Sequence, residues 1–436
     1  MIDKIEQYFN FDELKTNFRT ETLAGITTFV SMAYILFVNP NVLGAAGMSK
    51  GAIFTATALT SALGCLIMGL VAKYPFTVAP GLGINAFFTY TVVIGMGVSW
   101  KTALAGVFLA SIIFIIITIF KIREAIINAI PKDMKLAIAA GIGLFIAFLG
   151  LQEGGIIVAN ESTLVGMGSL SIGTTWLTIF GIVVTAILMV KKIPGAVFIG
   201  MVLTTILGLV TKLIALPQGI VASVPSIKST FMVAPQHIGD FNSIQMVMVV
   251  LTFLMVTFFD TAGTLVALAQ QGGFMKDNEL PRAGRALAAD STSMLVGSVL
   301  GTSPTSAYVE ASAGIAVGGR SGFTSVIVAI FFLLSLFFSP LLSIITSNVT
   351  APALIVVGVL MATSLKEIDW DKLEIAIPAF MTLVTMPLTY SISDGIAIGF
   401  IFYPITMITA KRGKEIHPLM YILALIFIFF FYITNK

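Results

Sequence analysis

The feature that most constrains the fold is a series of fifteen apolar runs, most of them long enough to cross a lipid bilayer. A spanning helix needs about 20 apolar residues, because lipid offers no partner to a free backbone N–H or C=O group. The runs lie at residues 23–43, 51–72, 76–97, 101–121, 133–150, 172–190, 195–214, 244–270, 285–301, 303–318, 322–345, 349–364, 373–390, 391–410 and 417–433. They predict an all-α polytopic membrane protein embedded in the cytoplasmic membrane.

The composition supports a chain that faces lipid. Charged residues make up 10% of the 436 residues and hydrophobic residues 57%, whereas about a quarter of a typical soluble chain is charged. A soluble fold of this size could not cover its surface with so few polar groups, so soluble enzymes and nucleic-acid binders are excluded. The single cysteine, Cys65, excludes an internal disulfide and a cysteine metal site.

The basic residues indicate the orientation. Nineteen of the 24 Lys and Arg residues fall on one side of the membrane if the N-terminus is cytoplasmic, and four fall on the other side. Because Lys and Arg gather in cytoplasmic loops, this asymmetry supports a cytoplasmic N-terminus and fourteen crossings up to residue 410. The pattern leaves open whether the last run, residues 417–433, crosses again.

Landmarks recur between the two halves of the chain. Pro80 and Pro304 each open a Gly- or Ser-rich interruption, GLFIA at 143–147 aligns with GVLMA at 358–362, and PGAVFIG at 194–200 aligns with DGIAIGF at 394–400. Seven runs then match seven, and because seven is odd the second copy is inverted, as in many secondary transporters. The predicted divisions are a leader (1–22), a first repeat (23–215), an extracellular loop (216–243), a second repeat (244–410) and a C-terminal basic and hydrophobic segment (411–436).

The interrupted segments, residues 77–88 and 301–312, predict a substrate site. In inverted-repeat transporters such broken helices meet near the midplane, where their freed backbone groups hold the cargo. Two acids lie deep in apolar runs: Asp260 in the eighth and Glu310 in the tenth. Acids within the membrane are costly and usually face a functional cavity, where they bind N–H donors or carry a coupled proton. A Walker A motif is absent from the sequence, which argues against an ATP-driven pump.

Four motifs in this order resemble the xanthine/uracil permease family of nucleobase–cation symporters, in its adenine/guanine/hypoxanthine branch. They are SMAYILFVNP (31–40), APGLGINAFF (79–88), FFDTAGTL (258–265) and GTSPTSAYVEASAGIAVGGRSGF (301–323). The resemblance implies fourteen segments as two inverted sevens. Segments one to four and eight to eleven would form a core domain, the other six a gate domain, and segments three and ten would each begin as a short strand.

The resemblance also implies a purine site and a mechanism. Asp260 and Glu310 take the positions of the family's substrate-binding acids, with proton coupling expected at both, and Asn85 takes that of the polar residue of segment three. A carboxylate can accept one or two hydrogen bonds from hypoxanthine or guanine. Asn85 would meet the opposite edge of the base, and Phe87 or Tyr308 would cover its face. The remaining predicted substrate-binding residues lie in the second broken segment and are Thr305 and Ser306.

The sequence therefore predicts a symporter that imports hypoxanthine, guanine or adenine by movement of core against gate. No cofactor is expected beyond the coupling ion, a proton, and a homodimer through the gate domain follows from the resemblance. Thr257 stands where relatives carry a further Asp, a departure that leaves specificity and coupling open. Three other functions remain: a same-fold carrier of xanthine, uracil or an anion, an intramembrane aspartyl protease, and a channel. An anion would be repelled by two acids, and a protease of this kind needs paired Asp residues.

Overall fold

The computed structural model describes residues 2–120, 130–217, 219–240, 244–275 and 280–434. Its first seven apolar segments follow the predicted order. They are α2 (Phe18–Met32) with α3 (Ile35–Ala45), α4 (Lys50–Ile67) with η1 (Met68–Ala72), β1 (Val78–Pro80) with α5 (Leu82–Ala86) and η2 (Phe87–Gly95), α6 (Trp100–Ile119), α8 (Lys132–Glu153), α9 (Gly173–Val190) and α10 (Ala196–Val210). Side chains cap two of these helices. Asn17 Oδ1 accepts from Thr20 N–H at the start of α2, and the Ser99 hydroxyl oxygen accepts from Thr102 N–H at the start of α6.

The next seven segments repeat this order. They are α12 (Ile244–Gly272), α13 (Ala283–Leu300), β4 (Thr305–Ala307) with α14 (Ala311–Ala316), α15 (Gly322–Ser335) with η4 (Leu336–Ser343), α16 (Ser347–Ala362) with η5 (Thr363–Glu367), α17 (Leu373–Thr389) and α18 (Ile392–Thr409). Among the described residues, eight helices are long and apolar enough to cross a membrane, and five shorter apolar helices accompany them. The predicted polytopic helical fold is confirmed. We call segments one to four and eight to eleven the core group, and the other six the gate group.

The two broken segments meet in the middle of the core group. Strands β1 and β4 pair antiparallel, with Val78 opposite Ala307 and Pro80 opposite Thr305. Two further backbone hydrogen bonds extend the ladder, from Gly81 N–H to Pro304 O (3.0 Å) and from Tyr308 N–H to Thr77 O (2.9 Å). Each segment becomes helical only after its strand, because the proline lacks the N–H that a continuous helix needs. The predicted short strands are confirmed, and they join one repeat to the other.

The gate group preserves the predicted repeat relation in its packing. Helices α8 and α16 cross where Gly143 and Gly358 approach each other, and a methyl group on Gly143 would lie 2.8 Å from the Gly358 carbonyl oxygen. These two glycines open the sequences GLFIA and GVLMA, which the repeat alignment matches. Equivalent residues of an inverted repeat face each other across its pseudo-twofold axis, and this crossing has that arrangement.

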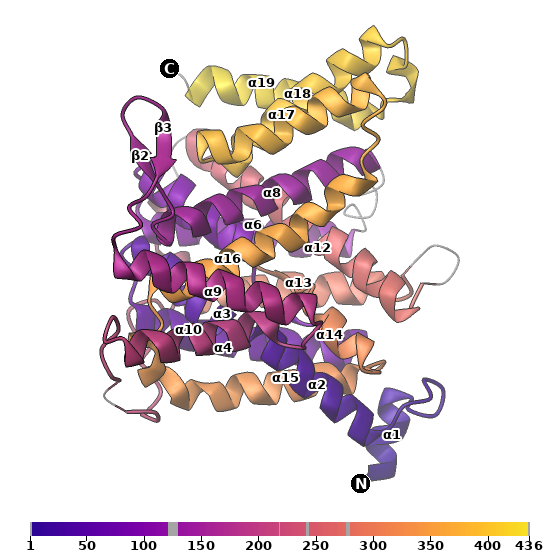
Figure 1. Cartoon of the computed structure of the whole chain (residues 1–436). Coiled ribbons are helices and arrows are strands. Elements are labelled where there is room, and N and C mark those ends of the chain that lie inside the picture. Colours follow the sequence, from indigo (N-terminus) through magenta and orange to yellow (C-terminus); the bar gives the residue numbers. More distant parts are fainter. Residues whose placement is uncertain (1, 121–129, 218, 241–243, 276–279, 435–436) are drawn as a thin grey trace.

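Seven elements of the described residues lie outside the fourteen segments, and the longest of them is the C-terminal helix. The C-terminal helix α19 (Pro418–Thr434) runs beside α18, with α17 on the other side of α18 (Figure 1). Strands β2 (Ile157–Asn160) and β3 (Leu164–Met167) form a hairpin that sequence reasoning missed. Its signal was the turn, where Asn160 Oδ1 accepts from the N–H groups of Ser162 (2.9 Å) and Thr163 (3.0 Å). The short elements are α1 (Ile2–Phe9), α11 (Val233–Gln236), η3 (Ile238–Asp240) and η6 (Gly413–Glu415).

A buried carboxylate joins the start of α2 to the start of α15. Glu21 is fully buried and accepts hydrogen bonds from Arg320 N–H (2.9 Å), Ser321 N–H (3.1 Å) and the Thr324 hydroxyl (2.6 Å). It satisfies donors at a helix N-terminus that have no partner within the helix. We expect Glu21→Ala to lower the free energy of unfolding by about 3 kcal/mol, because these donors would lose their acceptor.

The change is measured as the melting temperature of the purified protein in detergent. Glu13→Ala is the matched control, since Glu13 is exposed and accepts a hydrogen bond from the nearby Asn10 side chain at 3.0 Å. Equal melting temperatures for the two variants would contradict this structural role of Glu21.

Candidate substrate site

A cavity of about 240 Å³ lies between the core group and the gate group. Its core wall comes from the two broken segments, α12 and the junction of α2 and α3, while α8, α16 and η5 form the opposite wall. The core residues that line it are Tyr34, Gly81, Leu82, Gly83, Asp260, Thr264, Ala267, Ser306, Ala307, Tyr308, Val309 and Glu310. An apolar cavity of about 150 Å³ holds benzene, so this one has room for a small planar heterocycle.

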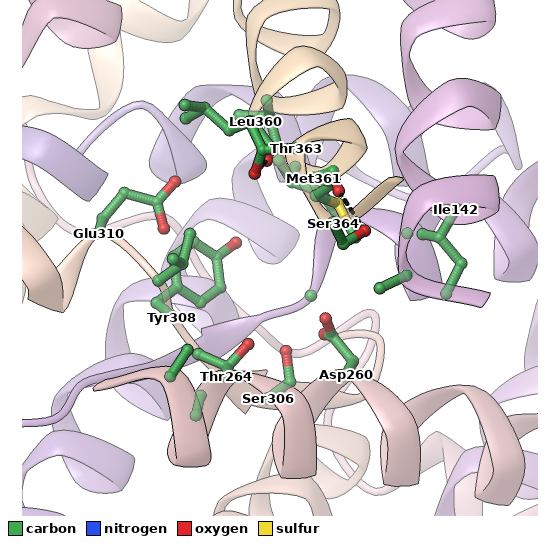
Figure 2. Close-up of a pocket in the computed structure, with 18 of the residues that line it drawn as sticks. Ile142, Asp260, Thr264, Ser306, Tyr308, Glu310, Leu360, Met361, Thr363 and Ser364 are labelled. Atoms are coloured by element: carbon green, nitrogen blue, oxygen red, sulfur yellow. Dashed lines mark hydrogen bonds between the residues drawn. The ribbon is translucent and has the colours of Figure 1, made fainter. Parts of the chain in front are cut away.

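Two acids and one tyrosine define the chemistry of the core wall. Asp260 and Glu310 both line the cavity and are half-buried, so each keeps some exposure to it. Tyr308 lies between them, and Thr264 and Ser306 add hydroxyl groups nearby (Figure 2). Two carboxylates on either side of an aromatic ring can accept hydrogen bonds from a planar ligand that rests against the ring.

Backbone hydrogen bonding holds the tyrosine in this position. The Tyr308 hydroxyl donates to the Pro80 carbonyl oxygen at 2.6 Å, and its own N–H donates to Thr77 O. Tyr308 therefore connects the end of one broken segment to the start of the other. The ring is 5% exposed, which leaves only one part of it accessible from the cavity.

Gly81 allows the closest backbone approach in the site. Its backbone is extended (φ −73°, ψ 130°), so any residue could adopt this conformation. A methyl group at this position, however, would lie 2.8 Å from Ser306 Oγ and 3.2 Å from Asp260 Oδ2. The absence of a side chain here leaves the space in front of Asp260 open.

The structure places four of the seven predicted site residues together and three elsewhere. Asp260, Glu310, Tyr308 and Ser306 line the cavity, whereas Asn85, Phe87 and Thr305 do not.

Each of these three is fully buried and directed to a neighbouring element. Asn85 accepts a hydrogen bond from the Ser303 hydroxyl, and its Nδ2 atom has no partner among the described residues. Phe87 packs edge to face on Phe253, with ring centroids 5.1 Å apart. The Thr305 hydroxyl donates to Asp290 O at 3.5 Å. Their contact with substrate stays a prediction, which the cavity lining does not support.

The gate wall was missed by sequence reasoning. It is formed by side chains from the first half of α8, the end of α16 and the start of η5, namely Ala139, Ile142, Val357, Leu360, Met361, Thr363 and Ser364. The Ser364 hydroxyl donates to Leu136 O at 3.2 Å and so joins η5 to the first turns of α8. A signal was available, because Leu360 and Met361 lie within the repeated GVLMA sequence and Ile142 directly precedes GLFIA. The alignment identified the helices, but the apolar side chains on them have no polar group that would indicate a binding site.

Contacts at the two ends of the cavity differ. Toward the start of α8 the lining continues to Thr363 and Ser364, and Lys132 pairs there with Glu367 at 3.2 Å, with both side chains exposed. At the opposite end, hydrogen bonds join the core group to the gate group. The Tyr90 hydroxyl donates to Glu153 Oε1, and the Thr91 hydroxyl donates to Tyr390 O at 3.1 Å.

No cluster of three or more His, Cys, Asp or Glu side chains suited to a metal ion occurs within the described ranges. The polar groups of the cavity are instead carboxylates, hydroxyls and backbone carbonyls, which suit a neutral organic ligand with N–H donors.

Comparison with known proteins assigns the chain to a protein family. The model of a permease family, named for xanthine and uracil permeases, matches residues 19–398. The chain belongs to the xanthine/uracil permease family. The family resemblance expected from the four motifs is thereby confirmed, and the protein is a transporter rather than an enzyme.

Two curated relatives cover nearly the whole permease. The guanine/hypoxanthine permease PbuG of Bacillus subtilis is 57% identical over 98% of this chain and 99% of its own length. The adenine permease AdeP of Escherichia coli is 41% identical over 97% of this chain and 95% of its own length. The aligned regions cover 98% and 97% of this chain.

Solved structures show the same fold at low sequence identity. The transmembrane domain of a cyanobacterial bicarbonate transporter, BicA, superimposes with a TM-score of 0.64 at 17% identity, covering 90% of the permease and 97% of that domain. A murine Solute Carrier 26 family anion transporter in the inward-facing state gives 0.61 at 14% identity, covering 94% and 72%. The permease thus has the fold of two inverted seven-segment repeats, as predicted.

Proposed function

We propose that this permease imports purine nucleobases, hypoxanthine and guanine ahead of adenine, across the cytoplasmic membrane. The observation that carries the proposal is the pair of half-buried acids, Asp260 and Glu310, on either side of Tyr308 in one small cavity. Hypoxanthine and guanine carry ring N–H groups that a carboxylate can accept, and their flat faces suit an aromatic ring. Adenine has an unprotonated ring nitrogen at the corresponding position, which a carboxylate would repel.

The curated relatives support this choice of cargo. The guanine/hypoxanthine permease PbuG is 57% identical to this chain, whereas the adenine permease AdeP is 41% identical. An anion is disfavoured because two acids line the cavity, even though the fold is shared with anion transporters.

Proton symport is the coupling that we propose. Asp260 lies on α12 and lines the cavity, where a carboxyl group can bind a base and exchange a proton. No metal ion or organic cofactor enters this scheme. A neutral base would then be driven inward by the proton gradient.

Alternating access between core and gate completes the proposal. The distribution of basic residues favours a cytoplasmic position for the start of α8 and the end of α16, so the cavity would reach toward the cytoplasmic side. The contacts of Tyr90 with Glu153 and of Thr91 with Tyr390 would then close the extracellular side. Movement of the core group against the gate group would then close the cavity on the cytoplasmic side and open it on the extracellular side. The gate-domain dimer stays a prediction.

The test is uptake of radiolabelled bases by cells that lack their own purine base transporters. We expect accumulation of hypoxanthine and guanine above the external concentration, weaker uptake of adenine, and loss of accumulation when an uncoupler collapses the proton gradient. Cells carrying the empty vector provide the baseline. Absence of uptake of every base would overturn the proposed cargo, and accumulation that follows a sodium gradient instead would overturn proton coupling.

A further inference from the structure

Tyr34 connects the first segment to the acid of the tenth. It lies at the junction between α2 and α3, is fully buried, and borders the cavity. Its hydroxyl group donates a hydrogen bond to Glu310 Oε1. The ring cannot swing away without displacing its packed neighbours, because buried side chains occupy close-packed positions. Tyr34 therefore holds the Glu310 carboxylate in one orientation, with Oε1 toward the Tyr34 hydroxyl.

This contact makes the two oxygens of Glu310 unequal. One oxygen already accepts the strong, charge-assisted bond from the Tyr34 hydroxyl. The other oxygen, Oε2, is the better acceptor for a ligand in the cavity. Asp260 has a different neighbour: it lies on α12 beside Ser306, which belongs to strand β4 (Figure 2). The two acids thus offer a ligand different hydrogen-bonding surfaces.

We propose that Tyr34 is a positioning and specificity-determining residue that limits Glu310 to one strong hydrogen bond from the base. The inference rests on the proposed transport of purines. Hypoxanthine presents a single N–H on the edge of its six-membered ring, whereas guanine presents the same N–H and an adjacent amino group. A carboxylate with both oxygens open would favour guanine strongly, because it could accept both donors side by side. Oε1 keeps a second lone pair, but because it already accepts from the Tyr34 hydroxyl, a further donor forms only a weaker bond there.

The first measurement uses the unaltered protein. Dissociation constants of hypoxanthine and guanine are measured by calorimetry on the purified full-length chain in detergent. We expect guanine to bind less than about threefold more tightly than hypoxanthine, because its amino group meets an oxygen that is already bonded. A preference for guanine of tenfold or more would overturn the proposal.

The second measurement uses Tyr34→Phe, which removes the hydroxyl and keeps the ring. Release of Oε1 is expected to shift the ratio of the two dissociation constants toward guanine by about tenfold, a change typical of one hydrogen bond to a charged group. Tyr90→Phe is the matched control, because Tyr90 also donates to a carboxylate, Glu153, but outside the cavity. A shift of the core–gate equilibrium would weaken both bases alike and leave their ratio unchanged.

The outcomes separate the inference from the proposed function. Equal weakening of both bases by Tyr34→Phe would mean that the residue is only structural, and the inference would fail while purine transport stands. If the unaltered protein binds neither base, the proposed function fails and the inference fails with it. Should Tyr34→Phe not fold, the ratio measured on the unaltered protein still decides the matter.

Discussion

Replacement of Glu310 by glutamine is expected to weaken hypoxanthine binding by at least about a hundredfold. The substitution keeps the shape of the side chain but removes its charge. The Tyr34 hydroxyl would still donate to the oxygen of the new amide, so the NH₂ group would turn toward the cavity. A donor would then face the N–H of the base, and both groups would lose their acceptor. Calorimetry with the purified protein measures the loss.

The control for this variant is Glu161→Gln. Glu161 is exposed in the turn between β2 and β3, so the same chemical change there should leave the dissociation constant unaltered. If Glu310→Gln bound hypoxanthine within about threefold of the unaltered protein, Glu310 would not be an acceptor for the base.

Substitution of Gly81 by valine is expected to reduce uptake at low substrate concentration by at least about thirtyfold, because overfilling a packed site typically costs 1–3 kcal/mol or more. The first added carbon would already lie 2.8 Å from Ser306 Oγ and 3.2 Å from Asp260 Oδ2. Two further methyl groups would fill the space in front of the acid. The backbone conformation at Gly81 suits valine, so the effect should arise in the cavity rather than from backbone strain.

Gly284→Val is the comparison. An added carbon at Gly284 meets no atom of the described residues within 4 Å, and Gly284 is exposed at the start of α13. We expect normal uptake by this variant. Both proteins should be present in the membrane in equal amounts, as judged by immunoblot. Normal uptake by Gly81→Val would contradict the position assigned to the substrate.

Much of the architecture could be predicted because lipid imposes a simple rule on the sequence. Every spanning backbone must be helical or be buried inside the protein, so apolar runs mark the segments and a proline such as Pro80 or Pro304 marks a break. The repeat alignment then predicted that the broken segments meet, and β1 and β4 do pair. The acids could be found for the same reason, since Asp260 and Glu310 are costly in lipid unless they line a cavity.

The details of the site could not be predicted in the same way. Asn85 and Phe87 lie in a recognisable motif, but the direction of each side chain depends on how α5 and η2 turn after the strand. In the structure they face Ser303 and Phe253 rather than the cavity. The gate wall is apolar, so Ile142 and Met361 look like any other residues of a membrane helix. Tyr34 was visible only as one aromatic residue among many, because its bond to Glu310 joins positions 276 residues apart.

Neither half of this chain can build the site alone, because the ladder takes β1 from one repeat and β4 from the other. If the chain were cut between residues 216 and 243, the halves would have to insert in opposite directions and find each other in the same bilayer. An ancestral protein with a single repeat would have met the same requirement, by inserting both ways round and pairing with an inverted copy of itself. Because one chain carries both repeats, each first repeat always has its partner within the same molecule.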